Sequence, residues 1–103
     1  MVIERQEIWW TKTRPVLVVQ SNSFNRSRLG TVVVVPLTSN LRLLDAPGNV
    51  LIPRGQSKLA KDSVVNVSLV RALDRSLLVE RVTRISKDRM REVDDGLKLV
   101  LDL

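Results

Sequence analysis

Polar side chains stand directly beside two strongly apolar segments of this sequence. Arg14 precedes the run at 15–20 (PVLVVQ), and a Thr-Ser-Asn triplet at 38–40 follows the run at 31–37 (TVVVVPL). Strand ends are fixed by their sheet and hold side chains at defined distances. Arg14 offers a planar, permanently charged fork that suits a phosphate. The alternatives are structural: a surface arginine beside a strand, and an ordinary strand-ending turn.

The triplet consists of Thr38, Ser39 and Asn40. Its two hydroxyls and one amide can donate hydrogen bonds to an anion or to the edge of a nucleobase. Trp10, beside Trp9, can also contact a nucleic acid, because its indole ring can stack on a base. In an alternating strand only one of the two tryptophans faces a given side, so we expect one in the core and one partly exposed.

The chain has 103 residues and contains neither histidine nor cysteine. The absence of cysteine excludes disulfides, thiolate metal sites and a cysteine nucleophile. The absence of histidine removes the commonest general base and the commonest zinc ligand, and with them Ser-His-Asp catalysis and His-based metal hydrolysis. We expect no metal and no cofactor.

The net charge of +6 is carried by one part of the chain. Residues 1–61 hold nine basic and three acidic residues, whereas residues 62–103 hold eight of each. This asymmetry suggests an anion-facing surface, with nucleic acid as the leading polyanion. Arg54, Lys58 and Lys61 lie in a polar loop and can follow a phosphate backbone; alternatively, the loop is simply solvated.

Short apolar runs between turn residues predict a single, mainly β domain over residues 1–103. Pro36 inside the most β-prone run predicts an edge or a bulge. Ser86 is a suitable N-cap for a C-terminal amphipathic helix. We therefore expect a small, strongly bent antiparallel sheet or barrel followed by one helix. The expected strands are 8–10, 15–20, 31–37, 50–52, 63–67, 70–73 and 78–85, and the apolar helix face is Met90, Val93, Leu97, Val100 and Leu101.

No run approaches the roughly 18–20 apolar residues of a membrane span. The start MVIERQEIWW carries charges and is not typical of a signal peptide. We expect a cytoplasmic protein without membrane contact.

Taken in order, these segments resemble the MazF/PemK family of toxin endoribonucleases from type II toxin–antitoxin modules. The resemblance covers nearly the whole chain and rests on an ordered set of segments. These are EIWW, RPVLVVQSNSFNRSR, TVVVVPLTSN, APGNVLIP, KDSVVNVS and the tail EVDDGLKLVLDL.

The resemblance implies an SH3-like barrel with a C-terminal helix, acting as a homodimer and restrained by a cognate antitoxin. It implies metal-independent cleavage of single-stranded RNA, usually mRNA, at short sequence motifs, which inhibits translation and growth. The products carry a 2′,3′-cyclic phosphate (or 3′-phosphate) and a 5′-hydroxyl. The family's catalytic arginine and threonine correspond to Arg14 and Thr38. We expect Gln20, Ser39 and Asn40 to line the RNA groove.

This chemistry is possible without histidine. The RNA supplies its own nucleophile, the 2′-hydroxyl, so the protein must chiefly stabilise negative charge on the phosphate oxygens. A guanidinium keeps its protons at neutral pH and is therefore a poor general base, so the proton acceptor stays unassigned.

Three positions depart from the family pattern. The family usually has about a dozen residues between the first two strands, whereas only Thr-Lys-Thr separates Trp10 from Arg14 here. Gln6 stands where a glycine is usual and is expected to narrow the groove, and Leu69 stands where a base-reading glutamine is common. The short connection favours an alternative hypothesis: a catalytically impaired module that still binds antitoxin or RNA. A third possibility is a related toxin that poisons a protein such as gyrase.

Overall fold

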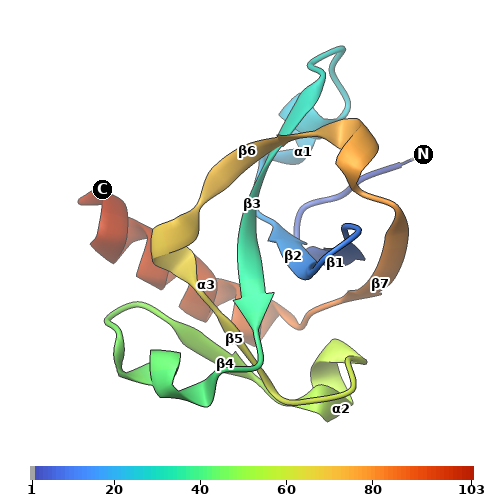
Figure 1. Cartoon of the computed structure of the whole chain (residues 1–103). Helices are drawn as coiled ribbons and strands as arrows, with labels where there is room; N and C mark the ends of the chain where they lie inside the picture. Colours follow the sequence, from blue (N-terminus) through green and yellow to red (C-terminus); the bar gives the residue numbers. More distant parts are fainter. Residues whose placement is uncertain (1) are drawn as a thin grey trace.

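The computed structural model describes residues 2–103. Seven strands form one curled antiparallel sheet, and a long C-terminal helix packs against it (Figure 1). The expected fold class, a small barrel-like β domain with a C-terminal helix, is confirmed. The strands are β1 Glu7–Trp10, β2 Pro15–Val18, β3 Thr31–Thr38, β4 Val50–Ile52, β5 Ser63–Val65, β6 Arg71–Asp74 and β7 Glu80–Arg84. The helices are α1 Asn22–Asn25, α2 Arg54–Ser57 and α3 Lys87–Leu101, with 3₁₀ turns η1 Leu41–Asp45, η2 Val67–Leu69 and η3 Arg75–Leu77.

β3 is the central strand, and its four consecutive valines suit a strand that is covered on both faces. One edge of β3 pairs with β2, where Val16 lies opposite Pro36. The other edge pairs first with β6 and then with β5. Pro36 lies where this partner changes, and its carbonyl accepts a hydrogen bond from the backbone N–H of Asn66 (3.0 Å). The edge or bulge predicted at Pro36 is not found, because β3 is an inner strand in regular register with β2; the interruption is a change of partner strand.

Two hydrophobic clusters lie on the two faces of the sheet. Leu17 of β2 belongs to one cluster, whereas its neighbours Val16 and Val18 belong to the other. Met90 and Val93 of α3 join the Leu17 cluster, so the helix covers that face. β2 and β3 are therefore apolar on both sides, which explains why these two strands read as continuous apolar runs.

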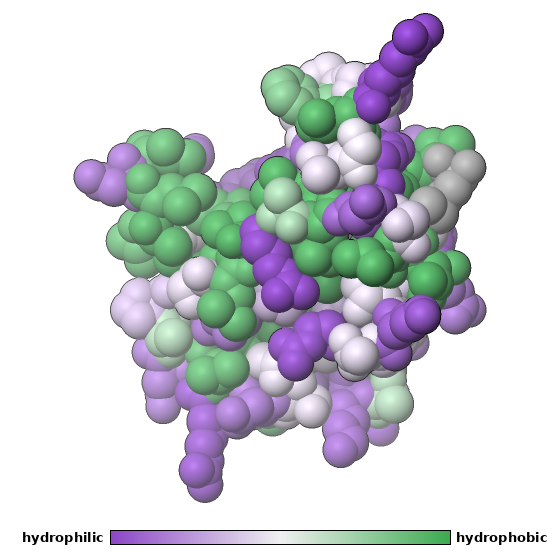
Figure 2. All heavy atoms as spheres, turned by 45° about the horizontal axis from the view of Figure 1, so that its top comes forward, coloured by the Kyte–Doolittle hydropathy of each residue, from purple (hydrophilic) through white to green (hydrophobic). Residues whose placement is uncertain are grey.

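α3 begins where the sequence predicts it. The Ser86 hydroxyl accepts a hydrogen bond from the backbone N–H of Arg89 (3.2 Å), and Asp88 lies in the first turn, where the helix dipole favours an anion. The first turns bury Met90 and Val93 as expected. The last turn leaves its apolar side chains exposed, and Figure 2 shows hydrophobic spheres covering this projecting end. These exposed residues are Leu99, Val100, Leu101 and Leu103.

Several predicted strands are longer than the strands that the structure shows. The strand expected over 15–20 ends at Val18, and the strand expected over 63–67 ends at Val65. The polar loop expected after Pro53 contains the short helix α2. None of the helices within residues 2–103 has the length and apolar character that crossing a membrane requires.

Gln6 stands at the position where the family usually has glycine, and its backbone adopts a conformation that glycine prefers. Its φ is 84°, in the left-handed region that glycine adopts without strain. Its side-chain amide donates to the Ile85 carbonyl (2.6 Å), and its backbone N–H donates to the Val18 carbonyl (2.8 Å). Gln6 lines none of the described hollows, and that it narrows the groove stays a prediction.

Candidate functional site

Arg14 and Thr38 lie at the same end of the β2–β3 ladder. β2 begins immediately after Arg14, and β3 ends at Thr38. The two strands run antiparallel with Val16 opposite Pro36, so continuing this register by two residues sets Arg14 opposite Thr38. Sheet pairing therefore brings together two residues that are 24 positions apart in the sequence.

A hollow of about 200 Å³ opens beside Thr38, and we call it the Thr38 hollow. Its walls are mostly apolar, and Trp10 forms part of them. Trp10 is 37% exposed whereas Trp9 is 5% exposed, so the predicted division between the two tryptophans is confirmed. The lining residues are Trp10, Pro15, Leu37, Thr38, Ser39, Leu59, Ala60, Lys61 and Ser63.

The hydroxyl of Thr38 is oriented by the turn that follows it. The backbone N–H of Asn40 donates to Thr38 Oγ1 (3.2 Å). Because the oxygen is the acceptor in this bond, the hydroxyl proton is free to donate to a bound anion. Asn40 itself caps η1: its Oδ1 accepts from the backbone N–H of Arg42 (3.2 Å). Asn40 lines none of the described hollows and acts on the site through Thr38.

A second hollow, of about 540 Å³, opens beside Arg14, and we call it the Arg14 hollow. It contains two exposed guanidinium groups, those of Arg14 and Arg71. Within residues 2–103 neither of them forms an ion pair or a side-chain hydrogen bond. Thr38 does not line this hollow, so Arg14 and Thr38 border neighbouring hollows rather than one. The lining residues are Thr13, Arg14, Pro36, Ser68, Leu69, Val70 and Arg71.

Arg71 is a candidate that sequence reasoning missed. It begins β6 and lies opposite Val34 of β3, and this long-range pairing carries it to the hollow. The only sequence signal was an arginine at the start of a short strand, as at Arg14. Leu69, noted as a departure from the family pattern, lines the same hollow.

The basic loop contributes two of its three predicted cations. Arg54 and Lys61 line a third hollow of about 390 Å³, which shares Ser39, Ala60 and Lys61 with the Thr38 hollow. Lys58 lines none of the described hollows. It ends α2 in the left-handed conformation with φ 63°. The prediction that Lys58 belongs to the site is not supported by its position.

Gln20 is a structural residue, which corrects its assignment to the RNA groove. Its side chain is buried, with 7% of the residue exposed. Its amide nitrogen donates to Asn25 Oδ1 (2.9 Å) and to the Thr31 carbonyl (3.3 Å). Its amide oxygen accepts from the backbone N–H of Val33 (3.2 Å). Gln20 thereby ties α1 to β3 and presents no free group to a ligand.

Glu7 is a buried carboxylate that anchors β1, and only 6% of the residue is exposed. Its Oε2 accepts from Arg81 Nε (2.5 Å), and its Oε1 accepts from Trp9 Nε1 (3.1 Å) and from the backbone N–H of Glu4 (2.8 Å). Burial by itself raises the pKa of Glu7, but the hydrogen bonds from Arg81, Glu4 and Trp9 outweigh it and hold the pKa below its usual value. Glu7 supports the strand that carries both tryptophans.

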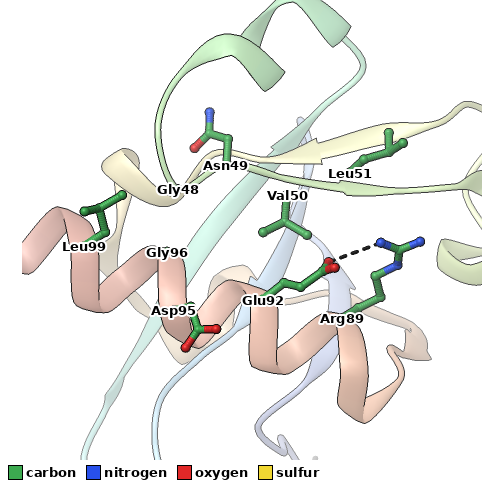
Figure 3. Close-up of a pocket in the computed structure, with 9 residues that line it drawn as sticks. All are labelled: Gly48, Asn49, Val50, Leu51, Arg89, Glu92, Asp95, Gly96 and Leu99. Atoms are coloured by element: carbon green, nitrogen blue, oxygen red, sulfur yellow. Dashed lines mark hydrogen bonds and ion pairs between the residues drawn. The ribbon is translucent and has the colours of Figure 1, made fainter.

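A further hollow lies between α3 and β4, away from the predicted site (Figure 3). It measures about 450 Å³, and Arg89 and Glu92 pair across its wall (3.2 Å). Gly48 and Gly96 also line it. None of the residues predicted for the functional site lines this hollow. Within residues 2–103 no three acidic residues cluster in a way that would hold a metal ion.

The fold and the basic sheet end define a small barrel protein with an anion-facing rim. The chain belongs to the family of PemK-like, MazF-like toxins of type II toxin–antitoxin systems, which it matches over residues 4–101. It is 45% identical to endoribonuclease MazF2 of Mycobacterium bovis and to endoribonuclease MazF6 of Mycobacterium tuberculosis, over the full length of each pair.

Solved structures show the same architecture. A MazE–MazF complex from Deinococcus radiodurans superposes with a TM-score of 0.82 at 27% identity, covering 99% of this chain and 98% of that one. A mycobacterial endoribonuclease in complex with its cognate antitoxin gives a TM-score of 0.85 at 23% identity, covering 98% of this chain and 96% of that one.

The alignment with these curated relatives is longer than this chain. It spans 114 positions and covers the whole chain of 103 residues, so 11 aligned positions have no counterpart here. That the shortening lies between Trp10 and Arg14 stays a prediction.

Proposed function

We propose that this toxin cleaves single-stranded RNA, chiefly mRNA, at the end of the β2–β3 ladder. The single observation that carries the site assignment is the pairing register that sets Arg14 opposite Thr38. One residue supplies a guanidinium without an ion-pair partner in the described residues, and the other supplies a hydroxyl whose proton is free. The kinship with proteins named endoribonuclease supports the reaction class.

The reaction needs no nucleophile from the protein. The RNA 2′-oxygen attacks the adjacent phosphorus, the new O2′–P bond forms, and the P–O5′ bond breaks. The 2′-hydroxyl loses its proton, and the leaving 5′-oxygen gains one. The products are a 2′,3′-cyclic phosphate and a 5′-hydroxyl. DNA lacks the 2′-hydroxyl and is not cleaved by this route.

The protein stabilises the negative charge that grows on the phosphate oxygens. Arg14 makes a bidentate contact and Thr38 donates one hydrogen bond. Because the two residues border neighbouring hollows, the scissile phosphate sits on the rim between them. The flanking nucleotides then enter the hollows: a base stacks near Trp10 in the Thr38 hollow, and a neighbouring phosphate meets Arg71 in the Arg14 hollow. The binding surface for the RNA continues along Ser39, Lys61 and Arg54.

We place the toxin in the cytoplasm as a homodimer controlled by a cognate antitoxin. The exposed apolar end of α3 supports self-association, because such a patch is rarely left in water. The titles of two structural neighbours name antitoxin complexes, MazE–MazF among them.

The test is cleavage of a panel of single-stranded RNAs by the purified protein in EDTA. We expect fragments with 5′-hydroxyl ends, and a rate loss of about 10²–10³ for Arg14→Ala and for Thr38→Val. Arg26→Ala is the matched control, because Arg26 is exposed and lines none of the described hollows. A metal requirement, 5′-phosphate products or full activity of Arg14→Ala would contradict the proposal.

The short connection after Trp10 is the observation that motivates the alternative of an impaired binding module, whereas the relatives named endoribonuclease support the nuclease. Induced expression in a bacterial host separates the two functions. Growth arrest that Arg14→Ala relieves supports the nuclease. Harmless expression combined with retained binding of RNA or antitoxin supports the module.

A further inference from the structure

The connection between β1 and β2 is a tight turn that Thr11 closes. The backbone N–H of Thr11 donates to the Arg14 carbonyl (2.9 Å). The Thr11 hydroxyl donates to the same carbonyl (2.9 Å) and accepts from the backbone N–H of Arg14 (3.2 Å) and of Thr13 (3.4 Å). Thr11 therefore binds both polar groups of the Arg14 main chain, the N–H and the carbonyl.

This turn lacks the residues that tight hairpins prefer. It contains no Gly, Asn or Asp, and neither Lys12 nor Thr13 adopts the positive φ of a type I′ hairpin turn. A threonine hydroxyl can replace such residues by satisfying nearby backbone groups. Thr11 does this here, whereas the Thr13 hydroxyl makes no hydrogen bond within the described residues.

The position of Arg14 depends on this turn. Arg14 lies outside β2, which begins at Pro15, so no sheet hydrogen bond within β2 fixes its main chain. Its guanidinium has no ion-pair partner in the described residues. The hydrogen bonds to Thr11 are thus the contacts that fix the Arg14 main chain, from which the side chain extends.

We propose that Thr11 is a positioning residue for Arg14: its hydroxyl fixes the Arg14 main chain so that the guanidinium reaches the scissile phosphate. This inference rests on the proposed function, in which Arg14 stabilises the transition state. Positioning of a charge that acts mainly in the transition state changes kcat and leaves substrate binding nearly unchanged. Thr11 itself does not touch the RNA.

Three variants test the proposal in a cleavage assay. Thr11→Val keeps the shape of the side chain and removes the hydroxyl, and Thr11→Ser keeps the hydroxyl. Thr31→Val is the matched control, because Thr31 is exposed and lines none of the described hollows. We expect kcat to fall about tenfold for Thr11→Val with KM within about twofold, as the loss of one or two hydrogen bonds predicts. Thr11→Ser and Thr31→Val should stay within about twofold of the wild type.

Two controls separate positioning from a general loss of structure. In an Arg14→Ala background, Thr11→Val should have no further effect on the rate, because the group it positions is gone. The backbone amide of Arg14 should exchange faster with solvent in Thr11→Val than in Thr31→Val. An undiminished kcat for Thr11→Val, or a loss that persists in the Arg14→Ala background, would overturn the proposal.

Failure of the proposed function gives a different result. If the wild-type protein cleaves no RNA, the nuclease assignment fails, and the catalytic role of Thr11 fails with it. The exchange measurement then still decides whether Thr11 holds the main chain of Arg14.

Discussion

The backbone of Gly96 in α3 touches the backbone of Gly48 in the turn before β4 (Figure 3). A Cβ on Gly96 would collide with the Gly48 carbonyl oxygen, and a Cβ on Gly48 would lie 3.1 Å from the Gly96 carbonyl oxygen. Gly48 also has a φ of 87°, which side-chain-bearing residues rarely adopt. α3 and the turn before β4 therefore pack backbone against backbone at this point.

Gly96→Ala should destabilise the fold by about 1–3 kcal/mol, because overpacking against backbone outweighs the helix propensity gained. The measurement is the free energy of unfolding in urea. Gly55→Ala is the matched control, since a Cβ at Gly55 meets nothing within 4 Å. A Gly96→Ala protein as stable as Gly55→Ala would show that the contact tolerates a methyl group.

Glu7→Gln should lower the free energy of unfolding at pH 7 by about 1–3 kcal/mol, because Arg81 loses a charged acceptor. The folded-state pKa of Glu7 lies below its ordinary value of 4.5, so its stabilising effect is complete above about pH 4.5 and is lost as the pH falls through the folded-state pKa. The difference between wild type and Glu7→Gln should therefore shrink below pH 4.5. Glu4→Gln, which breaks the exposed pair with Arg84, should change stability by less than about 1 kcal/mol.

Gln20→Ala should reduce stability and spare catalysis. Removing the amide leaves the partly buried backbone N–H of Val33 and the buried Asn25 Oδ1 without their partner, at a cost of about 1–3 kcal/mol. The initial rate of RNA cleavage per folded molecule should equal that of the wild type. A selective loss of RNA affinity without loss of stability would show instead that Gln20 contacts RNA in the groove.

Lys61→Gln and Lys58→Gln form a matched pair of charge removals in one loop. Only Lys61 lines the hollows at the site. Lys61→Gln should therefore weaken binding of single-stranded RNA and reduce the slope of log K against log salt by about 0.7, the value for one lost phosphate contact. Lys58→Gln should leave this slope unchanged. Equal effects of both variants would assign the loop a diffuse electrostatic role.

The elements that sequence reasoning found are those whose signal is local. The valine run of β3 and the Ser86 cap of α3 both depend on neighbouring residues. Arg71 was missed because its place beside Arg14 comes from long-range pairing of β6 with β3. Gln20 was misassigned because its partners, Asn25 and Val33, are brought to it by α1 and β3.

At Pro36 the strand β3 changes its partner from β6 to β5. Arg14 stands beside the β1–β2 part of the fold, whereas Thr38 is paired with β5 through Val64. The spacing between guanidinium and hydroxyl is consequently set across the β2–β3 pair, at the point where β3 exchanges its other partner. A substitution that shifted this pairing would separate the two groups without removing either of them.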